Sequence, residues 1–185
     1  MANQLWTARS YTSCNFRDAD LSGLQTETVT FTNCDFTGTN LTKSKHSGTA
    51  FRNCHFEYTQ LKNSVFRHST FVGSSFVDTR VRQIVLEEVD LTLASLGGID
   101  MRGVDLSGCR LREANLTKAD LRRAVLAGTD LSGARTGGMR LDDADLRGAQ
   151  VDAALWTTAK LDRTQVELGQ AVSFAGAHGL LVSGG

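Results

Sequence analysis

Four cysteines are the side chains in this sequence with the widest chemistry, because a thiolate can act as a nucleophile, bind a metal ion or form a disulfide. Cys14, Cys34 and Cys54 recur at a constant interval, and Cys109 stands alone. Protein zinc sites usually use closely spaced pairs such as CxxC, and the sequence has no such pair. Disulfides are rare in the cytoplasm, where we expect this chain to work. The spacing therefore predicts buried free thiols that fill small spaces in a core, with no bound metal.

The other residues with catalytic chemistry are histidines and clustered carboxylates. The histidines stand at positions 46, 55, 68 and 178, far apart in the sequence and outside any HExxH motif. The sequence also has no phosphate-binding loop and no nucleophile elbow. Asp142, Asp143 and Asp145 could share protons if folding arranged them around a substrate. Beyond this cluster we expect no catalytic residue and no cofactor.

The charge balance limits the possible partners. The chain has 20 basic and 20 acidic residues, whereas general nucleic-acid binding requires a basic excess. We therefore expect no direct contact with nucleic acid. The N-terminal MANQLWTARS lacks the basic and apolar regions of a secretion signal, and no run of apolar residues approaches the length of a membrane span. These features favour a cytoplasmic chain without a membrane segment.

A period of five residues organises the sequence. Of the 33 residues taken at every fifth position from Trp6 to Val166, 30 are apolar, whereas a composition of 41% hydrophobic residues would give about 13 by chance. We call these positions the centres. Two residues before most centres stands Ala, Cys, Ser, Thr or Val, and we call these the small positions. The exceptions are Leu24, Ile84, Ile99 and Met139.

A period of five matches neither an α-helix nor an ordinary strand. It fits a square coil in which each side takes one repeat and four repeats complete a turn, with the centre and the small position pointing inward. Such coils would stack through backbone hydrogen bonds at about 4.8 Å. One large and one small side chain on each side would fill the narrow interior without overpacking it. The repeat therefore predicts an all-β solenoid.

The centres also predict a core of two kinds. Eight of the nine phenylalanines are centres before residue 80, and leucine dominates afterwards. His46 is a centre and should point inward, and the cysteines occupy small positions. A closed rod offers no pocket, so we expect the cluster at 142–145 to form a solvated surface instead of a catalytic site. The principal core residues expected are Phe31, Phe36, Phe51, Phe56, Phe66, Phe71, Phe76, Leu106, Leu111, Leu116 and Leu121.

The end of the chain leaves the five-residue pattern. Residues 166–179 are predicted to form a short helix, with apolar residues at i, i+3, i+4 and i+7. Thr164 and Glu167 fit a capping box, and Gly179 fits a C-terminal stop. This apolar tail could fold back as a cap over the open end of the coil, or it could join two copies in a symmetric homodimer. In the second case the contact residues would be Leu168, Ala171, Val172, Phe174, Ala175, Leu180 and Leu181.

Outward residues that are four repeats apart should lie above one another and form columns. Asp100 would stack on Asp120, and Asp145 would lie two coils above Asp105; we expect these carboxylates to be unpaired. A further column of positions 90, 110 and 130 alternates Asp, Arg and Asp, which predicts a ladder of ion pairs. The alternative is an ordinary solvated surface in which Asp serves turn geometry. The candidate acidic partner-binding face consists of Asp100, Asp105, Asp120, Asp130, Asp142, Asp143 and Asp145.

Several units read A(D/N)Lxx, at residues 19–23, 114–118, 119–123 and 144–148. These units resemble the pentapeptide repeat family, over about residues 11–166. The resemblance implies a right-handed quadrilateral β-helix across 11–166, with residues 1–10 as a lead-in and 167–185 as a C-terminal helix and tail that is the expected dimerisation element.

Longer segments resemble the mycobacterial fluoroquinolone-resistance members of that family. They span residues 50–54, 91–98, 108–113, 130–136, 140–149 and 170–180. This resemblance implies a dimeric DNA mimic that binds DNA gyrase, inhibits it and protects it from quinolones. Since the chain is neutral overall, contact through a local acidic face is favoured over mimicry along the whole rod. The alternatives are a structural scaffold for another protein partner and an enzyme, for which the sequence offers no residues.

Overall fold

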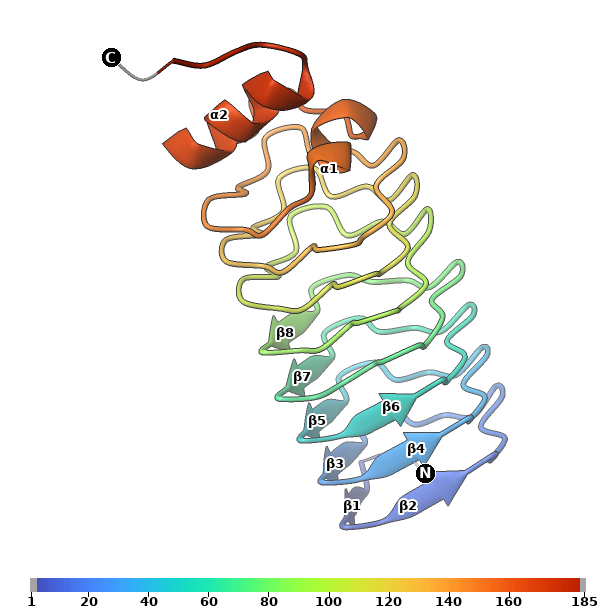
Figure 1. Ribbon diagram of the computed structural model, residues 1–185. Coiled ribbons are helices and arrows are strands. Elements are labelled where there is room, and N and C mark those ends of the chain that lie inside the picture. The colour runs from blue at the N-terminus through green and yellow to red at the C-terminus, as the bar shows by residue number, and fades with distance from the viewer. Residues whose placement is uncertain (1–2, 184–185) are drawn as a thin grey trace.

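The computed structural model describes residues 3–183, and it shows a rod of stacked coils that ends in two helices (Figure 1). Five short parallel strands form one side of the first coils, in the order β1 (Leu5–Thr7), β3 (Gln25–Glu27), β5 (Lys45–Ser47), β7 (Val65–Arg67) and β8 (Val85–Glu87). The next side carries β2 (Ser10–Thr12), β4 (Thr30–Thr32) and β6 (Ala50–Arg52). Isolated parallel bridges join the later coils. The fold is a right-handed quadrilateral β-helix, as predicted.

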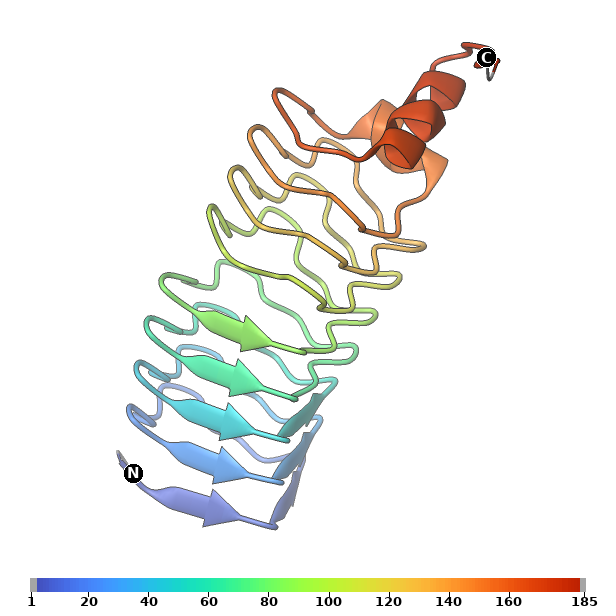
Figure 2. The same cartoon turned by 90° about the vertical axis from the view of Figure 1, so that its left-hand side faces the viewer.

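The strand register confirms that four repeats complete one coil. Trp6 pairs with Thr26, and Phe31 pairs with Phe51. In the regular coils, the N–H of a centre donates to a carbonyl of the next coil, as from Leu21 to Asn40 at 2.9 Å. Figure 2 shows the resulting stack from its side.

Each corner of the square is a residue with positive φ, two residues after a centre. Asp18, with φ +55°, and Gly38, with φ +69°, are corners of neighbouring coils. The left-handed region is costly for most residues and cheapest for Gly, Asn and Asp, which explains the frequency of these three types at corners. Just before a centre, an Asp or Asn side chain often accepts the N–H two residues on; Asp20 accepts from Ser22 at 3.0 Å. The corners therefore come from local turn chemistry, without proline.

The core is arranged as predicted from the centres. Phenylalanine rings of successive coils stack face to face, with centroids 5.0 Å apart for Phe36 and Phe56 and 4.9 Å for Phe56 and Phe76. Hydroxyls at the small positions donate to carbonyls of the previous coil, as from Thr59 to Phe36 at 2.8 Å. The expected core residues are all buried: Phe31, Phe36, Phe51, Phe56, Phe66, Phe71, Phe76, Leu106, Leu111, Leu116 and Leu121.

The cysteines and His46 also point inward. Cys34, Cys54 and Cys109 are buried, Cys14 is half-buried, and all four are free thiols. Burial raises the pKa of Cys54 to about 12, so this thiol is inert as a nucleophile at neutral pH. The His46 ring forms hydrogen bonds with the hydroxyls of Thr26 at 2.7 Å and Ser44 at 2.9 Å, and burial lowers its pKa to about 3.

Both ends of the chain differ from the expected boundaries. Residues 3–10 already belong to the first coil, since β1 pairs with β3, although the sequence had suggested a lead-in; residues 1–2 lie outside the described part. A short helix, α1 (Ala153–Thr158), replaces one side of the last full coil and was not predicted. The centre within it, Trp156, remains buried, which explains why the five-residue pattern did not reveal the helix.

The C-terminal helix was predicted, but its start was misplaced. Helix α2 (Leu168–Ala177) begins after Glu167, whose side chain forms a capping box with Gln170. Thr164 is not part of the cap, because its hydroxyl donates to the carbonyl of Leu141 at 2.9 Å. Gly179, with φ +80°, ends the helix as expected.

Candidate protein-binding surface

The aspartates of the candidate acidic face are positioned by the corners of the coil. In Asp105, Asp120 and Asp145, Oδ1 accepts the N–H two residues later, at 2.9, 3.3 and 3.0 Å. This bond satisfies a backbone donor at the turn, so the carboxylate has a structural role as well as an outward charge. Turn geometry, the alternative reading from the sequence, therefore accounts for part of the aspartate pattern.

The predicted columns are present. Asp100 forms a parallel bridge with Asp120, and position 125 lies between Asp105 and Asp145. Positions 90, 110 and 130 also stack in order. The four-sided register therefore places the outward side chains as the sequence predicted.

The prediction of unpaired carboxylates was wrong for three of the four aspartates and held only for Asp105 among the described residues. Asp100 pairs with Arg102 at 2.7 Å, and an arginine two residues on also pairs with Asp120 at 2.6 Å and with Asp145 at 2.7 Å. Since side chains i and i+2 of an extended segment point to the same face, the recurring Asp-x-Arg spacing places each pair together. Hydrogen bonds from these arginines lower the pKa of all three carboxyls. The spacing was visible in the sequence and is the signal that was missed.

The predicted ion-pair ladder of positions 90, 110 and 130 was also wrong. Asp130 contacts Arg112 at 3.5 Å, and Arg110 has no ion pair among the described residues. Arg112 lies one coil below Asp130 but two residues further along the side, so the pair is diagonal instead of vertical. This geometry leaves the column without a continuous ladder.

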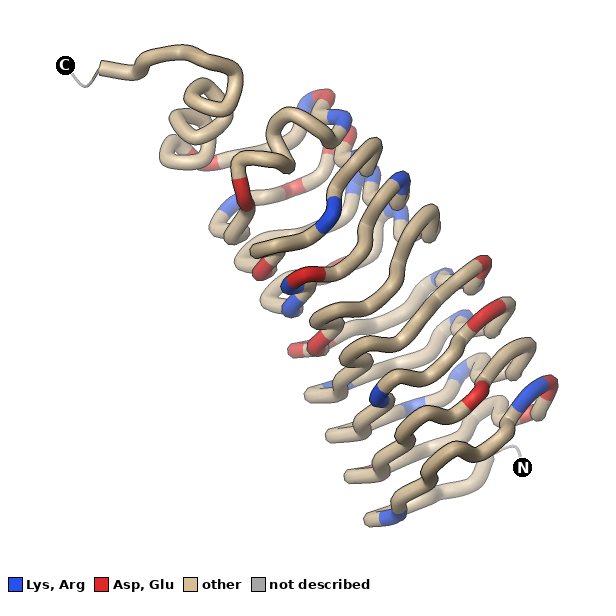
Figure 3. The backbone as a smooth tube through the Cα atoms, turned by 45° about the vertical axis from the view of Figure 1, so that its right-hand side comes forward, with Lys and Arg blue, Asp and Glu red and all other residues tan. Residues whose placement is uncertain are grey.

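A second group of charges lies near the C-terminal corner at 140–143 and 162–163. Arg163 donates from Nε and a terminal nitrogen to the two oxygens of Asp143, at 2.6 and 2.9 Å. It also contacts Asp162 at 3.1 Å, while Arg140 contacts Asp142 at 3.4 Å. Three carboxylates face these two guanidinium groups, and Arg123, one coil below Asp143, adds a third positive charge, so the corner is balanced in charge. Figure 3 shows acidic and basic positions interleaved along the C-terminal half.

These pairings also bear on the catalytic alternative. Asp142, Asp143 and Asp145 contact three different arginines, so they do not share a proton as a catalytic dyad would. Within residues 3–183, no three His, Cys, Asp or Glu side chains are grouped so that they could hold a metal ion. Of the seven aspartates of the candidate face, only Asp105 lacks an ion pair in the described part; it accepts from the Ser107 hydroxyl at 2.6 Å.

The C-terminal end of the rod is the other candidate surface. The amide of Gln170 on α2 donates to the carbonyls of Leu146 at 2.7 Å and Ala149 at 2.9 Å, so the helix covers part of the last coil. Its apolar side chains do not complete a cap, because Leu168 is 82% exposed and Val172 44%. Further exposed apolar residues are Phe174, Leu180, Leu181 and Val182. Of the other residues named for dimerisation, Ala171 is exposed and Ala175 half-buried.

Comparison with known proteins identifies relatives across almost the whole chain. Residues 5–81 match the family described as Pentapeptide repeat region, and residues 76–108 and 105–148 match the family described as Pentapeptide repeats (8 copies). The Pentapeptide repeat protein MfpA of Mycobacterium tuberculosis is 56% identical over 182 residues, which cover 98% of this chain and 100% of MfpA. None of the described helices is long and apolar enough to cross a membrane.

Two solved structures share the fold. QnrB1, a plasmid-mediated fluoroquinolone resistance protein, has a TM-score of 0.60 and 20% identity, with 97% of this chain and 100% of that chain covered. HetL, a pentapeptide repeat protein involved in heterocyst differentiation regulation in the cyanobacterium Nostoc, has a TM-score of 0.57 and 22% identity, with 89% and 87% covered. At these identities the likeness concerns the fold alone.

Proposed function

The chain belongs to the pentapeptide repeat family, and we propose that it is a cytoplasmic, non-enzymatic protein that binds DNA gyrase, modulates or inhibits it and protects it from fluoroquinolones. The observation that carries the proposal is the 56% identity to MfpA over 98% of the chain. The resemblance of several sequence segments to fluoroquinolone-resistance proteins supports the same proposal. A rod with outward carboxylates would occupy the DNA-binding groove as a mimic, without contacting nucleic acid itself.

The charge pattern decides where the rod would contact gyrase. Exposed ion pairs contribute little, about 0–1 kcal/mol, so basic groups of a DNA-binding groove could replace the arginines that now hold the aspartates. Asp105, which has no ion pair in the described part, needs least rearrangement and would bind first, whereas Asp142 and Asp143 would have to exchange Arg140 and Arg163. Asp100, Asp120, Asp130 and Asp145 would then contribute through exchange of their arginine partners.

A homodimer would present this face twice. The apolar side chains exposed on α2 and after it offer a contact at the end of the rod, and a two-fold axis there would join two rods end to end. Replacing Leu168 and Val172 with Asp should yield monomers in sedimentation equilibrium at low micromolar concentration. Ser183→Asp, outside the apolar surface of the helix, serves as the control; equal molecular masses for all three proteins would contradict the dimer.

Gyrase supercoiling assays test the function directly. Purified protein should inhibit supercoiling and should reduce the cleaved DNA that accumulates with a fluoroquinolone. Asp105→Lys combined with Asp143→Lys should weaken both effects, whereas Glu27→Lys in the N-terminal half should not. No effect of the wild type at large molar excess over gyrase would refute the proposal and would favour the alternative, a β-helix scaffold for another protein partner, which the largely paired charges of the surface also suit.

A further inference from the structure

The stack of coils is open along one seam. Leu61 and Asn63 donate to the carbonyls of the next coil, at 3.1 Å in each case, and Met101 donates to Asp120 at 2.9 Å. The coil pair in between is different: within the described chain, no backbone hydrogen bond joins residues 77–88 to residues 97–107. Strand β8, at the edge of this gap, is the last strand of its sheet. We call the gap between 77–88 and 97–107 the seam.

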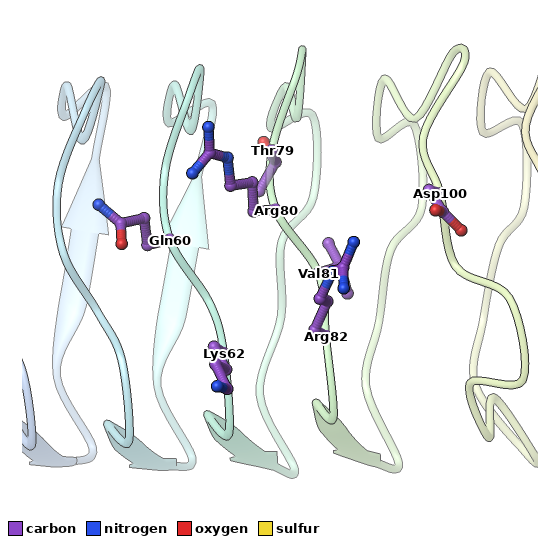
Figure 4. Close-up of a pocket in the computed structure, with 7 residues that line it drawn as sticks. All are labelled: Gln60, Lys62, Thr79, Arg80, Val81, Arg82 and Asp100. Atoms are coloured by element: carbon purple, nitrogen blue, oxygen red, sulfur yellow. The ribbon is translucent and has the colours of Figure 1, made fainter.

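The seam opens on two sides of the square and is closed on the others. Phe76 still donates to Ser95 at 2.9 Å, and Leu91 donates to Arg110 at 2.7 Å. Figure 4 shows the wider space between the coil that carries Thr79–Arg82 and the coil that carries Asp100. We call the two facing backbone edges, residues 77–88 and residues 97–107, the lips of the seam. Their backbone donors and acceptors lack the partners that equivalent residues have in the other coils.

Large residues occupy the small positions where the coils separate. Ile84 lies one coil below Val104, and Ile99 lies one coil above Thr79. Leu24 is also large, but its neighbour in the next coil is Ser44, and the bond from Lys45 to the Leu24 carbonyl, 2.8 Å, is intact. An isoleucine therefore lies against a β-branched neighbour at both places, and a small apolar cavity lined by Ile84 and Ile99 accompanies the separation of the coils.

The lips of the seam carry cations and exposed apolar side chains. Lys62, Arg80, Arg82 and Arg123 line the adjoining pockets, whose volumes are about 410 and 750 Å³, and none of the four has an ion pair among residues 3–183. Two carboxylates also line these pockets: Asp100 is held by Arg102, and Asp105 accepts from the Ser107 hydroxyl, so the cations remain in excess. Tyr58, Val77 and Val85 are 60%, 44% and 38% exposed beside the same gap. The surface is therefore basic and apolar and has free backbone hydrogen-bonding groups.

We propose that the seam binds an extended acidic peptide segment of a protein partner. The peptide adds as a strand to an open lip, which satisfies the backbone groups there, and its carboxylates pair with Lys62, Arg82 and Arg123. A strand supplies alternating donors and acceptors with the spacing that the open backbone edge requires, whereas the sugar–phosphate backbone of duplex DNA supplies only acceptors. This surface is separate from the apolar C-terminal end but includes Asp100 and Asp105 of the candidate acidic face. The peptide-binding proposal does not depend on gyrase binding.

Binding of a defined probe tests the proposal. The probe is a fluorescein-labelled octapeptide that alternates glutamate and valine, and fluorescence anisotropy with the full chain should show saturable binding. The same peptide with lysine for glutamate, or with alternate backbone nitrogens methylated, should bind at least about tenfold more weakly, since it loses the charge or the strand hydrogen bonds. Equal binding of either control peptide, or no saturation by the probe at millimolar concentration, would overturn the proposal.

Two kinds of variant locate the site. Arg82→Glu with Arg123→Glu should weaken binding about tenfold or more, whereas Arg52→Glu with Lys118→Glu, which makes the same charge change elsewhere on the rod, should not. Ile84→Ala with Val104→Ala keeps every cation but should let the seam close, and it should also weaken binding. Hydrogen exchange gives an independent readout, because the amides of Val81 and Gln83 should exchange fast in the free protein and become protected by the probe. Full affinity in both seam variants would refute the site.

Discussion

The coils before residue 88 and the coils after it have the same plan but different cores. All eight strands lie in the first part, where phenylalanine rings stack in columns. In the second part leucines fill the centres, and the same sides are joined only by isolated bridges. Both parts keep the corners and the register of four repeats per coil. The comparison shows that the turns and the alternation of large and small inward residues set the coil. Aromatic stacking does not by itself make a strand, because the side that carries Phe36, Phe56 and Phe76 is also joined only by isolated bridges.

The boundary between the two parts is also where the ladder of hydrogen bonds fails. The centres change from Phe76 to Val81 and Leu86 without a break in the core cluster. The gap coincides with large residues at the small positions, Ile84, Ile99 and Val104. A large residue at a small position is tolerated where its neighbour is small, as for Leu24 below Ser44 and Met139 above Ala119, whose ladders are closed. The gap lies where a large residue meets a branched one.

The largest expected effect is in the aromatic stack. Phe56→Ala should lower the free energy of unfolding by about 3–5 kcal/mol, because it leaves a cavity between two stacked rings. Leu116→Ala, the matched change in the second part, should cost about 2–5 kcal/mol, without the contribution of ring stacking. Urea unfolding of both variants measures the difference. A loss below about 1 kcal/mol for Phe56→Ala would mean that this ring does not support the core.

The next prediction concerns how the free energy of unfolding depends on pH, through a histidine buried in the first part. His46 lies in the aromatic part, and its pKa of about 3 in the folded chain is below the ordinary 6.5 because burial disfavours the charged ring. The unfolded chain therefore takes up this proton first, and stability falls as the pH drops below 6.5. Between pH 7 and pH 5 the loss should be about 2 kcal/mol. His46→Phe should remove this dependence, whereas His68→Phe on the exterior should retain it; identical pH profiles for the wild type and His46→Phe would contradict the assignment.

A smaller effect is expected at the boundary itself. Ile84→Ala should cost less than about 1 kcal/mol, because the lost burial is offset by relief of overpacking against Val104. Leu24→Ala is the control, since Leu24 is equally oversized but lies in a closed ladder; it should show the ordinary cost of about 2–5 kcal/mol. Urea midpoints compare the two. If Ile84→Ala costs as much as Leu24→Ala, crowding is not what opens the seam.

The sequence predicted the parts of the structure that repeat. Phe36 and Leu116 could be assigned to the core because each belongs to a series of inward positions, and a series is insensitive to one exception. Helix α1 was missed because Trp156 keeps the phase of the repeat while the backbone changes. The ion pairs were missed because the vertical columns were considered without the Asp-x-Arg spacing along each side, as in Asp120 and Arg122. The seam lies where Ile84 meets Val104 in space. The sequence showed that Ile84 is a large residue at a small position, but not that the coils would separate there.

The smallest effect concerns the ion pairs of the second part, and Asp120 tests them. The hydrogen bond from Arg122 lowers the pKa of this carboxyl in the folded chain below its ordinary 3.8, so its stabilisation is complete above that value and is lost as the pH falls through the folded-state pKa. Asp120→Asn should therefore lower stability at pH 7 by at most about 1 kcal/mol, with a difference that shrinks below pH 4 so that the acid limb is flatter, and 1 M NaCl should reduce the difference at pH 7.

Arg122→Gln should flatten the acid limb only in part, because the backbone N–H of residue 122 still donates to Asp120, and the double variant should lose no more than Asp120→Asn alone. An acid limb that stays as steep in both single variants as in the wild type would show that Asp120 serves the turn alone. In that case the aspartates of the second part could bind a partner's basic groups directly, without first breaking their ion pairs with arginine.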